Sequence, residues 1–350
     1  MFLKSLYLRN FRNYAEAEVF FSPKVNLITG DNAQGKTNLI EAIYLLTTGR
    51  SFRTNHLKDL IKQGENFFFL EAIISKNQIE QKIQIAFDGK TKKLTLDSSQ
   101  YGTFQHLLGI LPSVLYLPQD IELIDGSPTI RRRFFNLHLA QRDPLYIHHF
   151  MRYWKAMKQR NALLKTKILD SIECWEAQMD LSATYLTKSR KILIDSIQSE
   201  VESNSRYLSS EKEIHRIEYL ANTPENYLIQ LQKNRLREQY LGTTLMGPHR
   251  DDFLLKINEF NAKGFASEGQ KKTASFALRL SEWDIFFKIA QISPLFCIDD
   301  LSVHLDSIRQ KHFSERIGLL GQVFITSPHP IPFIREATIH PIPLKNRHLA

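Results

Sequence analysis

The sequence has only two cysteines, Cys174 and Cys297, among 350 residues. Neither belongs to a C-x-x-C pair, which argues against a disulfide framework, a cysteine-based zinc site and a dithiol redox centre. No apolar run approaches the roughly 18 residues of a membrane span, and Lys4 and Arg9 interrupt any apolar core of a secretion signal. We therefore expect a protein of the reducing cytoplasm, neither secreted nor embedded in a membrane.

Short-period repeats and low-complexity tracts are also absent, which argues against a solenoid and against widespread disorder. Hydrophobic residues make up 43% of the chain and charged residues 24%, as in ordinary globular proteins. At roughly 150 residues per domain, the length favours two domains. The formal net charge of +9 allows a polyanionic partner without naming one.

The N-terminal third of the chain is rich in strand patterns. Alternating apolar and polar residues predict a hairpin over 3–9 and 17–20. Further β-rich runs, separated by Asn, Gly and Lys, predict a small antiparallel sheet. Its three strands are expected at 67–75, 80–87 and 91–96.

The rest of the chain changes character twice. Residues 128–238 are helical in pattern, whereas strands and helices alternate again from Tyr240 onward. The apolar runs 295–298 and 323–325 read as buried parallel strands. The simplest arrangement is an α/β fold with an inserted helical lobe. Its predicted boundaries are 1–118 and 239–350 for the α/β head and 119–238 for the lobe.

A complete G-x-x-x-x-G-K-T motif lies between the apolar run 25–29 and the helical pattern 36–46. Its residues are Gly30, Asp31, Asn32, Ala33, Gln34, Gly35, Lys36 and Thr37. This context distinguishes a phosphate-binding loop from a turn with an accidental Lys-Thr pair. Backbone N–H groups would surround phosphate oxygens, Lys36 would reach the β- and γ-phosphates, and Thr37 would ligate Mg²⁺. ATP and Mg²⁺ are the predicted ligands.

Two acids, Asp299 and Asp300, follow the buried strand 295–298. A carboxylate in this position completes the metal site of phosphate-loop enzymes, and we assign Asp299 to the Mg²⁺ side. Asp300 would orient or deprotonate the water that attacks the γ-phosphate. The competing interpretation is an acidic helix cap after a core strand.

The segment 265–270 precedes a helical pattern and contains Ser267, Gly269 and Gln270. It resembles the L-S-G-G-Q signature of ABC-type ATPases. In that family the signature binds the γ-phosphate held by a second subunit, so this resemblance implies ATP sandwiched between two protomers. Leu305-Asp306 similarly resembles the D-loop, and Thr326-Ser327 occupies the place of the γ-phosphate switch residue.

Two other classes of phosphate-loop protein compete with this interpretation. A membrane-transport ATPase would place its signature much closer to the phosphate loop than the roughly 230 residues that separate Thr37 from Ser267. A small-molecule kinase is disfavoured by the signature itself. SMC proteins have a far longer separation with sustained heptads, which are missing from this sequence.

At this point the whole chain resembles the RecF family of bacterial recombination mediators. The most specific pieces are G-S-P-x-x-R-R-R at 126–133 and G-P-H-R-D-D at 247–252. The other matching segments are 10–13, 30–42, 49–53, 159–161, 267–270 and 299–300. Departures from the family pattern are Gln119 for Glu, Asn136 for Asp, and Val303-His304-Leu305-Asp306 for its D-loop sequence.

The resemblance implies an ABC-type ATPase head with a helical second lobe and an ATP-dependent homodimer. It also implies slow, DNA-stimulated hydrolysis, binding of double-stranded and gapped DNA near the nucleoid, and work with RecO and RecR in loading RecA. Arg12, Asn13 and Asn38 would lie near the nucleotide. His249, Arg250 and Asp252 would lie by the dimer face. Gln119 would sense Mg²⁺, although a Pro-Gln turn without that role fits equally well.

Positive charge is concentrated in residues 131–167, where ten Lys and Arg face one acid, Asp143. This window accounts for the whole formal excess of nine charges. The DNA-binding candidates are Arg131, Arg132, Arg133, Arg152, Lys155, Lys158 and Arg160. Phosphate contacts by such residues are independent of base sequence. A solvated helix face is the alternative for each of them, and 131–133 can also be structural or reach the nucleotide.

Overall fold

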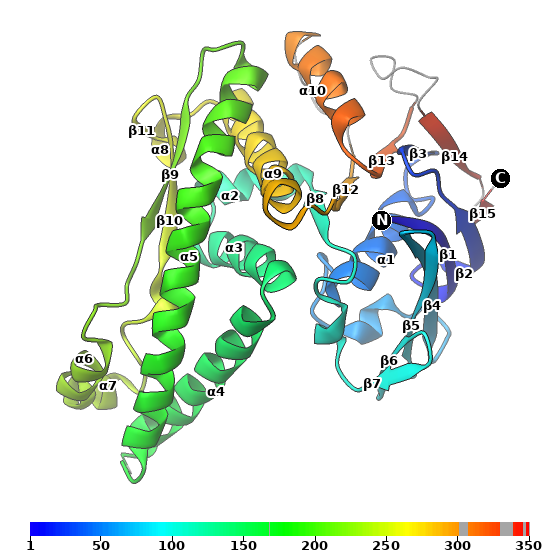
Figure 1. The fold of residues 1–350 in the computed structure, drawn as a ribbon. Helices are drawn as coiled ribbons and strands as arrows, with labels where there is room; N and C mark the ends of the chain where they lie inside the picture. Colours follow the sequence, from blue (N-terminus) through cyan, green and yellow to red (C-terminus); the bar gives the residue numbers. More distant parts are fainter. Residues whose placement is uncertain (168, 301–306, 330–338, 346–347, 350) are drawn as a thin grey trace. The chain divides into compact units, whose positions relative to one another are not determined.

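In a computed structural model the chain folds into two units (Figure 1), and all residues are described except 168, 301–306, 330–338, 346–347 and 350. The first unit comprises Met1–Asp120, Tyr207–Ser209 and Phe276–Ala350. The second unit comprises Ile121–Arg206 and Ser210–Ser275. Among the helices described, none has both the length and the apolarity to cross a membrane.

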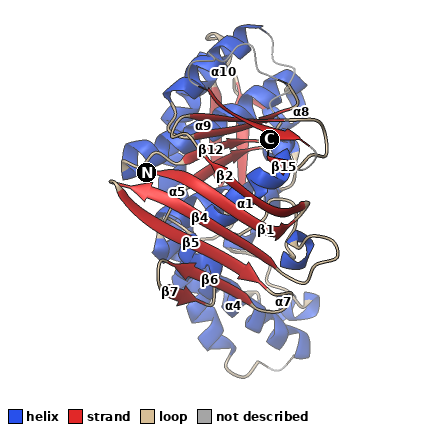
Figure 2. Ribbon diagram, turned by 90° about the vertical axis from the view of Figure 1, so that its right-hand side faces the viewer, coloured by secondary structure: helices blue, strands red, loops and turns tan. Residues whose placement is uncertain are grey.

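A six-stranded antiparallel sheet forms one layer of the first unit (Figure 2). Its order is β2 (Tyr14–Phe20), β1 (Phe2–Phe11), β4 (Phe68–Lys76), β5 (Ile79–Phe87), β6 (Lys92–Leu96) and β7 (Ser99–Tyr101). The predicted hairpin and the predicted small sheet are both confirmed. They merge into one sheet because β1 also pairs with β4, with Leu6 opposite Ala72.

The second sheet of this unit carries the candidate nucleotide site. Four of its strands are β3 (Val25–Thr29), β13 (Val323–Ser327), β12 (Leu295–Ile298) and β8 (Ser113–Tyr116), in this order and all parallel. β14 (Ile339–Lys345) extends it beyond β3, and β15 (His348–Leu349) pairs antiparallel with β14. The predicted parallel strands are therefore confirmed. Every side chain of β12 and β13 is buried, which explains their continuous apolar sequence.

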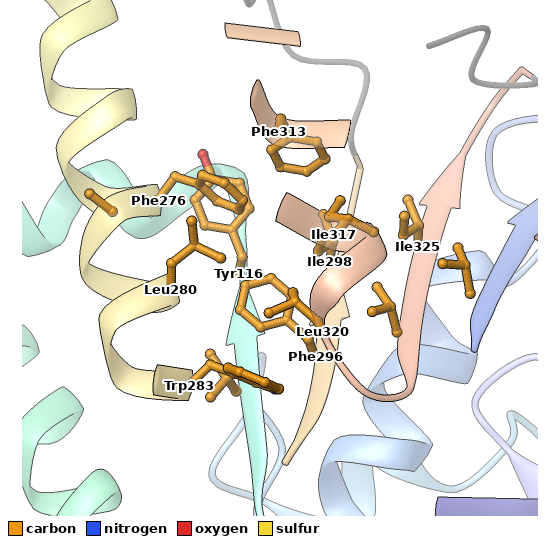
Figure 3. Packing of buried hydrophobic residues seen from close by; sticks show 14 of the residues in the cluster. Tyr116, Phe276, Leu280, Trp283, Phe296, Ile298, Phe313, Ile317, Leu320 and Ile325 are labelled. Atoms are coloured by element: carbon orange, nitrogen blue, oxygen red, sulfur yellow. The ribbon is translucent and has the colours of Figure 1, made fainter. Parts of the chain in front are cut away.

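Three helices accompany these sheets: α1 (Lys36–Thr48), α10 (Ser307–Leu319) and α9 (Glu268–Ala290), which begins in the second unit. Short 3₁₀ turns lie at Leu57–Leu60, Phe104–Leu107 and Pro118–Ile121. Figure 3 shows the core between α9, β12 and α10, where Phe276 packs against Phe313 with ring centroids 4.5 Å apart. Trp283 of α9 belongs to this core, and its indole N–H donates to the Pro294 carbonyl.

Helices dominate the second unit, as predicted. They are α2 (Glu122–Asp125), α3 (Pro128–Arg142), α4 (Pro144–Thr166), α5 (Ile172–Ser209), α6 (Tyr227–Lys233), α7 (Arg235–Leu241) and α8 (Ala262–Phe265), with a 3₁₀ turn at Pro248–Arg250. α3 and α4 both begin with proline, which has no N–H to leave unsatisfied. The Asp143 carboxylate caps α4 by accepting from the Leu145 N–H.

A three-stranded antiparallel sheet in this unit differs from the sequence prediction. β9 (His215–Leu220) lies within the stretch expected to be helical, and it pairs with β10 (Asp252–Ile257), which also pairs with β11 (Phe260–Asn261). This pairing brings residues up to Ser275 into the second unit. Apart from Tyr207–Ser209, which belong to the first unit, the second unit runs from 121 to 275, whereas the predicted lobe ran from 119 to 238.

A buried cluster of charges joins the helices of the second unit. Arg160 of α4 has no exposed surface and binds Glu176 of α5 at 3.0 Å and Glu238 of α7 at 2.7 Å. Both carboxylates are themselves fully buried. Arg160 also donates to the Thr244 hydroxyl and to the Leu231 carbonyl. Each partner compensates the desolvation of the others, so removing one leaves unpaired charge inside the protein.

We predict that Arg160→Ala lowers the free energy of unfolding by about 3–5 kcal/mol, because Glu176 and Glu238 lose their common buried cation. Urea unfolding followed by circular dichroism measures the change. Lys158→Ala on the same helix is the control, since this exposed residue should change stability by less than about 0.5 kcal/mol. Equal stability of the two variants would contradict the assignment.

Candidate functional site

The phosphate-loop motif lies between β3 and α1, as its chemistry requires. Three of its residues adopt left-handed backbone angles: Gly30 at φ +149°, Ala33 at +67° and Gly35 at +112°. The φ of +112° at Gly35 is one that residues with a Cβ atom rarely adopt, and an added Cβ would also lie 2.7 Å from the Asn13 side-chain nitrogen, so glycine is favoured there. The loop therefore presents backbone N–H groups at the start of a buried helix, which is a favourable site for phosphate.

The Lys36 ammonium closes this loop from within. Its Nζ donates to the carbonyl oxygens of Gly30 at 2.5 Å and Asp31 at 2.9 Å. Asp31, Asn32 and Ala33 are exposed at the top of the loop. The ammonium and the loop N–H groups thus form a single cationic cradle of the kind that binds a polyphosphate.

Asp299, which follows β12, forms hydrogen bonds with residues of α1 and β13. Its Oδ1 accepts from the Thr37 hydroxyl at 3.0 Å and from the Thr326 hydroxyl at 2.8 Å. Burial raises the pKa of the Asp299 carboxyl, and the hydrogen bonds from Thr326 and Thr37 oppose that rise. A carboxylate and hydroxyl oxygens are the donor set that Mg²⁺ prefers, so these residues fit the predicted metal.

Asp300 occupies a different environment from Asp299. It is exposed, its backbone is left-handed with φ +56°, and its N–H donates to the Thr326 hydroxyl at 2.7 Å. Left-handed backbone is unfavourable for a residue with a side chain and is frequent at functional sites. The strand end thus separates a buried carboxylate from an exposed one.

Gln119 lies in the 3₁₀ turn Pro118–Ile121 and is exposed. Among the described contacts, none joins its side chain to Thr37 or Asp299. The adjacent Asp120 is buried and binds the Arg279 guanidinium of α9 through two hydrogen bonds of 2.8 Å. This pair was missed by the sequence analysis. The pair attaches the turn that contains Gln119 to helix α9.

The turn between β1 and β2 supports the phosphate loop from the side. Asn13 donates to the Gln34 carbonyl at 3.1 Å and accepts from the Asn38 amide at 2.6 Å. Tyr14 donates to the Gly35 carbonyl at 3.1 Å, and burial raises the pKa of its phenol. Asn13 and Asn38, both predicted to lie near the nucleotide, therefore meet at the loop.

Arg12, which was predicted to lie near the nucleotide, is bonded within the protein. Its guanidinium forms a fork with the buried Glu41 carboxylate at 2.7 and 2.8 Å and also donates to the Asp59 carbonyl. These bonds hold the β1–β2 turn against α1. Arg53, which is half-exposed, donates to Asn38 Oδ1 at 2.8 Å and lies 3.7 Å from Glu41. Arg53 was not among the predicted site residues, although its segment 49–53 matches the family pattern.

The ABC-type signature begins α9 in the second unit. Ser267 Oγ accepts from the Gln270 N–H at 3.3 Å, while Gln270 Oε1 accepts from the Ser267 N–H at 2.9 Å. This reciprocal pair is a capping box, and Thr273 bonds back to the Gly269 carbonyl. Ser267 is exposed at the positive end of a 23-residue helix. Val303, His304, Leu305 and Asp306, the predicted D-loop segment, lie outside the described residues.

The structure corrects part of the predicted DNA-binding set. Arg160 is completely buried in its ion pairs and cannot reach a phosphate. Arg131 is nearly buried and forks onto Asp252 at 2.8 and 2.9 Å. Arg132 is half-buried and donates to the Asp251 carbonyl. These guanidiniums attach α3 and α4 to their own unit.

The remaining candidates stay accessible on the second unit. Lys155 and Lys158 are exposed on α4, and Arg152 is half-buried one turn before Lys155. The spacing of three residues places them along one side of the helix. Neither lysine forms an ion pair with any residue that the structure describes. Arg133 is exposed on α3.

Most side chains of the G-P-H-R-D-D segment take part in a polar network. His249 Nε2 donates to the Thr244 carbonyl, so Nδ1 accepts from the Tyr153 hydroxyl at 2.7 Å. Burial lowers the pKa of His249 to about 4. Asp251, fully buried, accepts from Arg190 and from Tyr219. Asp252 is the partner of Arg131, whereas Arg250 is exposed.

Comparison with known proteins gives the same family from sequence and from structure. The family model described as RecF/RecN/SMC N terminal domain matches residues 2–338. The DNA replication and repair protein RecF of Protochlamydia amoebophila is 44% identical over 340 residues, covering 94% of this chain and 95% of the relative. RecF of Chlamydia caviae is 40% identical over 343 residues, with 94% and 93% covered.

Solved structures extend this likeness to the fold. The recombination mediator protein RecF with ATP in the RecFOR pathway has 28% sequence identity and a TM-score of 0.89, over 99% of this chain and 96% of that chain. The SMC head bound to the C-winged helix domain of ScpA has 15% identity and a TM-score of 0.58, over 100% and 96%, which shows a shared fold alone. The chain therefore belongs to the RecF family of DNA replication and repair proteins and has the ABC-type ATPase fold.

Proposed function

We propose that this protein is an ATP-gated, DNA-binding recombination mediator. Two copies close over two ATP–Mg²⁺ units, DNA lies on the second units, and hydrolysis reopens the dimer. The observation that supports this most strongly is the 3.0 Å contact between the Thr37 hydroxyl and the Asp299 carboxylate beneath the phosphate loop. Thr37 and Asp299, two of the residues predicted to bind Mg²⁺, are therefore hydrogen-bonded neighbours in a chain of the RecF family, which supports the proposal.

The residues of this site divide the work of ATP hydrolysis. Lys36 and the loop N–H groups bind the phosphates, while Thr37 and Asp299 hold Mg²⁺, which neutralises charge on the β- and γ-phosphates when bound. Release of Lys36 from the Gly30 and Asp31 carbonyls makes its ammonium available to the phosphates. Asp300, which is exposed next to Asp299, orients or deprotonates the attacking water.

The signature of one copy completes the binding site for the γ-phosphate of the ATP held by the other copy. Ser267, Gly269 and Gln270 lie at the start of α9, where the positive end of the helix dipole favours an anion. The capping box keeps this turn in its anion-ready conformation. ATP binding is thus coupled to dimerisation. Because ATP and DNA both bind the dimer better than the monomer, each raises the affinity of the protein for the other.

DNA contacts come from Arg152, Lys155 and Lys158 on α4, together with Arg133 on α3. These side chains bind phosphates and do not read bases, so the preference for gapped duplex arises from DNA shape. Hydrolysis is slow and stimulated by DNA, so ATP acts as a switch between the closed dimer and the open state. RecR and RecO act with this protein in loading RecA near the nucleoid, as implied by its family. Gln119 senses the metal from its turn at the head.

Lys36→Ala is expected to weaken ATP binding by about tenfold or more, because a charged hydrogen-bond donor to phosphate is worth about 1.5–3 kcal/mol. Asp300→Asn should preserve binding and slow hydrolysis by about a hundredfold or more, because it removes only the group acting on water. Titration with a fluorescent ATP analogue and phosphate release measure the two effects. Equal loss of binding in both variants would refute the division of roles.

Ser267→Arg should leave ATP binding intact and abolish ATP-dependent dimerisation, because the arginine blocks the turn that receives the partner's phosphate. Analytical ultracentrifugation with and without ATP measures this. Ser267→Asn is the matched control, since asparagine still caps α9 and should allow dimerisation. A protein that stays monomeric with ATP before any substitution would overturn the proposed dimer.

Replacing Lys155 and Lys158 together by alanine should weaken binding to gapped duplex at every sequence tested. The slope of log affinity against log salt should fall by about two, roughly one for each lost phosphate contact. Fluorescence anisotropy at several salt concentrations provides the measurement. The control is alanine at Lys24 and Lys90, two exposed lysines of the first unit. The same slope change in the control would refute the assigned surface.

A further inference from the structure

α7 and its flank display apolar side chains that the fold leaves in solvent. Tyr240 is 89% exposed and Leu236 81% exposed, and half of Leu241 is exposed. Ile229 of the neighbouring α6 is also half-exposed. Isolated exposed apolar residues are ordinary, but several on one seven-residue helix mark a surface that binds another molecule.

The exposure is not a consequence of a loose helix. Glu238, on the opposite side of α7, is fully buried and binds Arg160 at 2.7 Å while its other oxygen accepts from the Leu245 N–H. Arg235 pairs with Glu176 at 2.6 Å and belongs to the same inner side. At 100° per residue, positions 236, 237, 240 and 241 form one face and 235 and 238 the other. Ion pairs therefore hold the inner side of α7 against the unit, and its apolar face points outward.

Basic side chains surround this face. Arg237 lies on the face itself, and Lys233 is exposed at the end of α6. Lys165 of α4 lies against the end of α7, since a Cβ at Gly242 would be 3.0 Å from Lys165 Cγ. Lys167 follows it, also exposed. Glu176 and Glu238 are paired inside the unit, and the exposed Glu173 is paired with Arg235 at 2.8 Å. The exposed cations Arg237, Lys233, Lys165 and Lys167 outnumber this one exposed acid, so the rim carries net positive charge.

We propose that the α7 face, defined by Leu236, Arg237, Tyr240 and Leu241, docks an acidic segment of a partner protein that carries apolar side chains. Tyrosine and arginine are enriched among residues that dominate binding energy, and the two leucines require apolar contacts to bury. A duplex backbone offers phosphates but nothing apolar to cover leucines. The basic rim selects acidic partners and accelerates their encounter. This inference does not rest on the proposed ATP switch.

A synthetic helical peptide with leucines on one side and glutamates on the other provides the first probe. Its binding to the full-length protein, followed by fluorescence anisotropy, should weaken at least tenfold in the double variant Leu236→Ser, Tyr240→Ser. A peptide with lysine in place of every glutamate should also bind at least tenfold more weakly. Phe260→Ser is the matched control, because Phe260 is an exposed aromatic residue elsewhere in the same unit, and it should leave binding unchanged.

Cross-linking in cells provides the second test. With Tyr240→p-benzoyl-phenylalanine, the photoadduct should map to an Asp- and Glu-rich segment of another protein and should disappear when Arg237→Glu is added. ATP and DNA binding, measured in the same variants, should stay unchanged. Equal binding of the glutamate and lysine peptides would overturn the proposal, and so would adducts only to DNA or to a second copy of this chain.

Discussion

The Asp299 carboxylate is the point on which the nucleotide site depends. Three segments that are far apart in sequence meet there, because Thr37 lies in the first turn of α1, Thr326 is the last residue but one of β13, and Asp299 directly follows β12. The parallel register of β3, β13 and β12 brings these ends to the same edge of the sheet. Burial makes the carboxylate's charge costly, and the two hydroxyls reduce that cost. The same arrangement provides oxygen ligands for a cation.

The second unit shows a different use of charge. Its buried guanidiniums, those of Arg160 and Arg190, each join several helices or strands through carboxylates and carbonyls. Buried carboxylates of the same unit neutralise their positive charge. Only basic residues outside these networks, such as Lys155 and Lys158, remain for a polyanion. Basic composition alone therefore overstates the accessible positive charge of this unit.

Several elements were predictable because their signals are local. The phosphate loop needs glycines at fixed positions between a strand and a helix, and the continuous apolar runs of β12 and β13 reflect burial on both faces. Tyr146, Tyr153 and Met157 recur at helical spacing and are buried on the inner side of α4. Arg160 continues that spacing, which was a signal of its burial, yet its charge led to the DNA-binding prediction.

Other features depend on contacts between distant residues. β9 is a short strand between helices, and only its pairing with β10 reveals it and moves the end of the second unit to Ser275. The Asp120–Arg279 pair and the fork of Arg12 on Glu41 leave no local pattern in the sequence. Nothing local distinguishes the outward α7 face from an ordinary helix either, because its orientation is set by the burial of Glu238.

Residue order within short windows was enough to predict the family, the phosphate loop, the acids after β12 and the long helices. Tertiary structure decided which charged side chains are free and which are consumed inside the fold. The physical reason is that a cation's availability depends on the carboxylates and carbonyls that surround it in space. Those partners come from segments tens to hundreds of residues away.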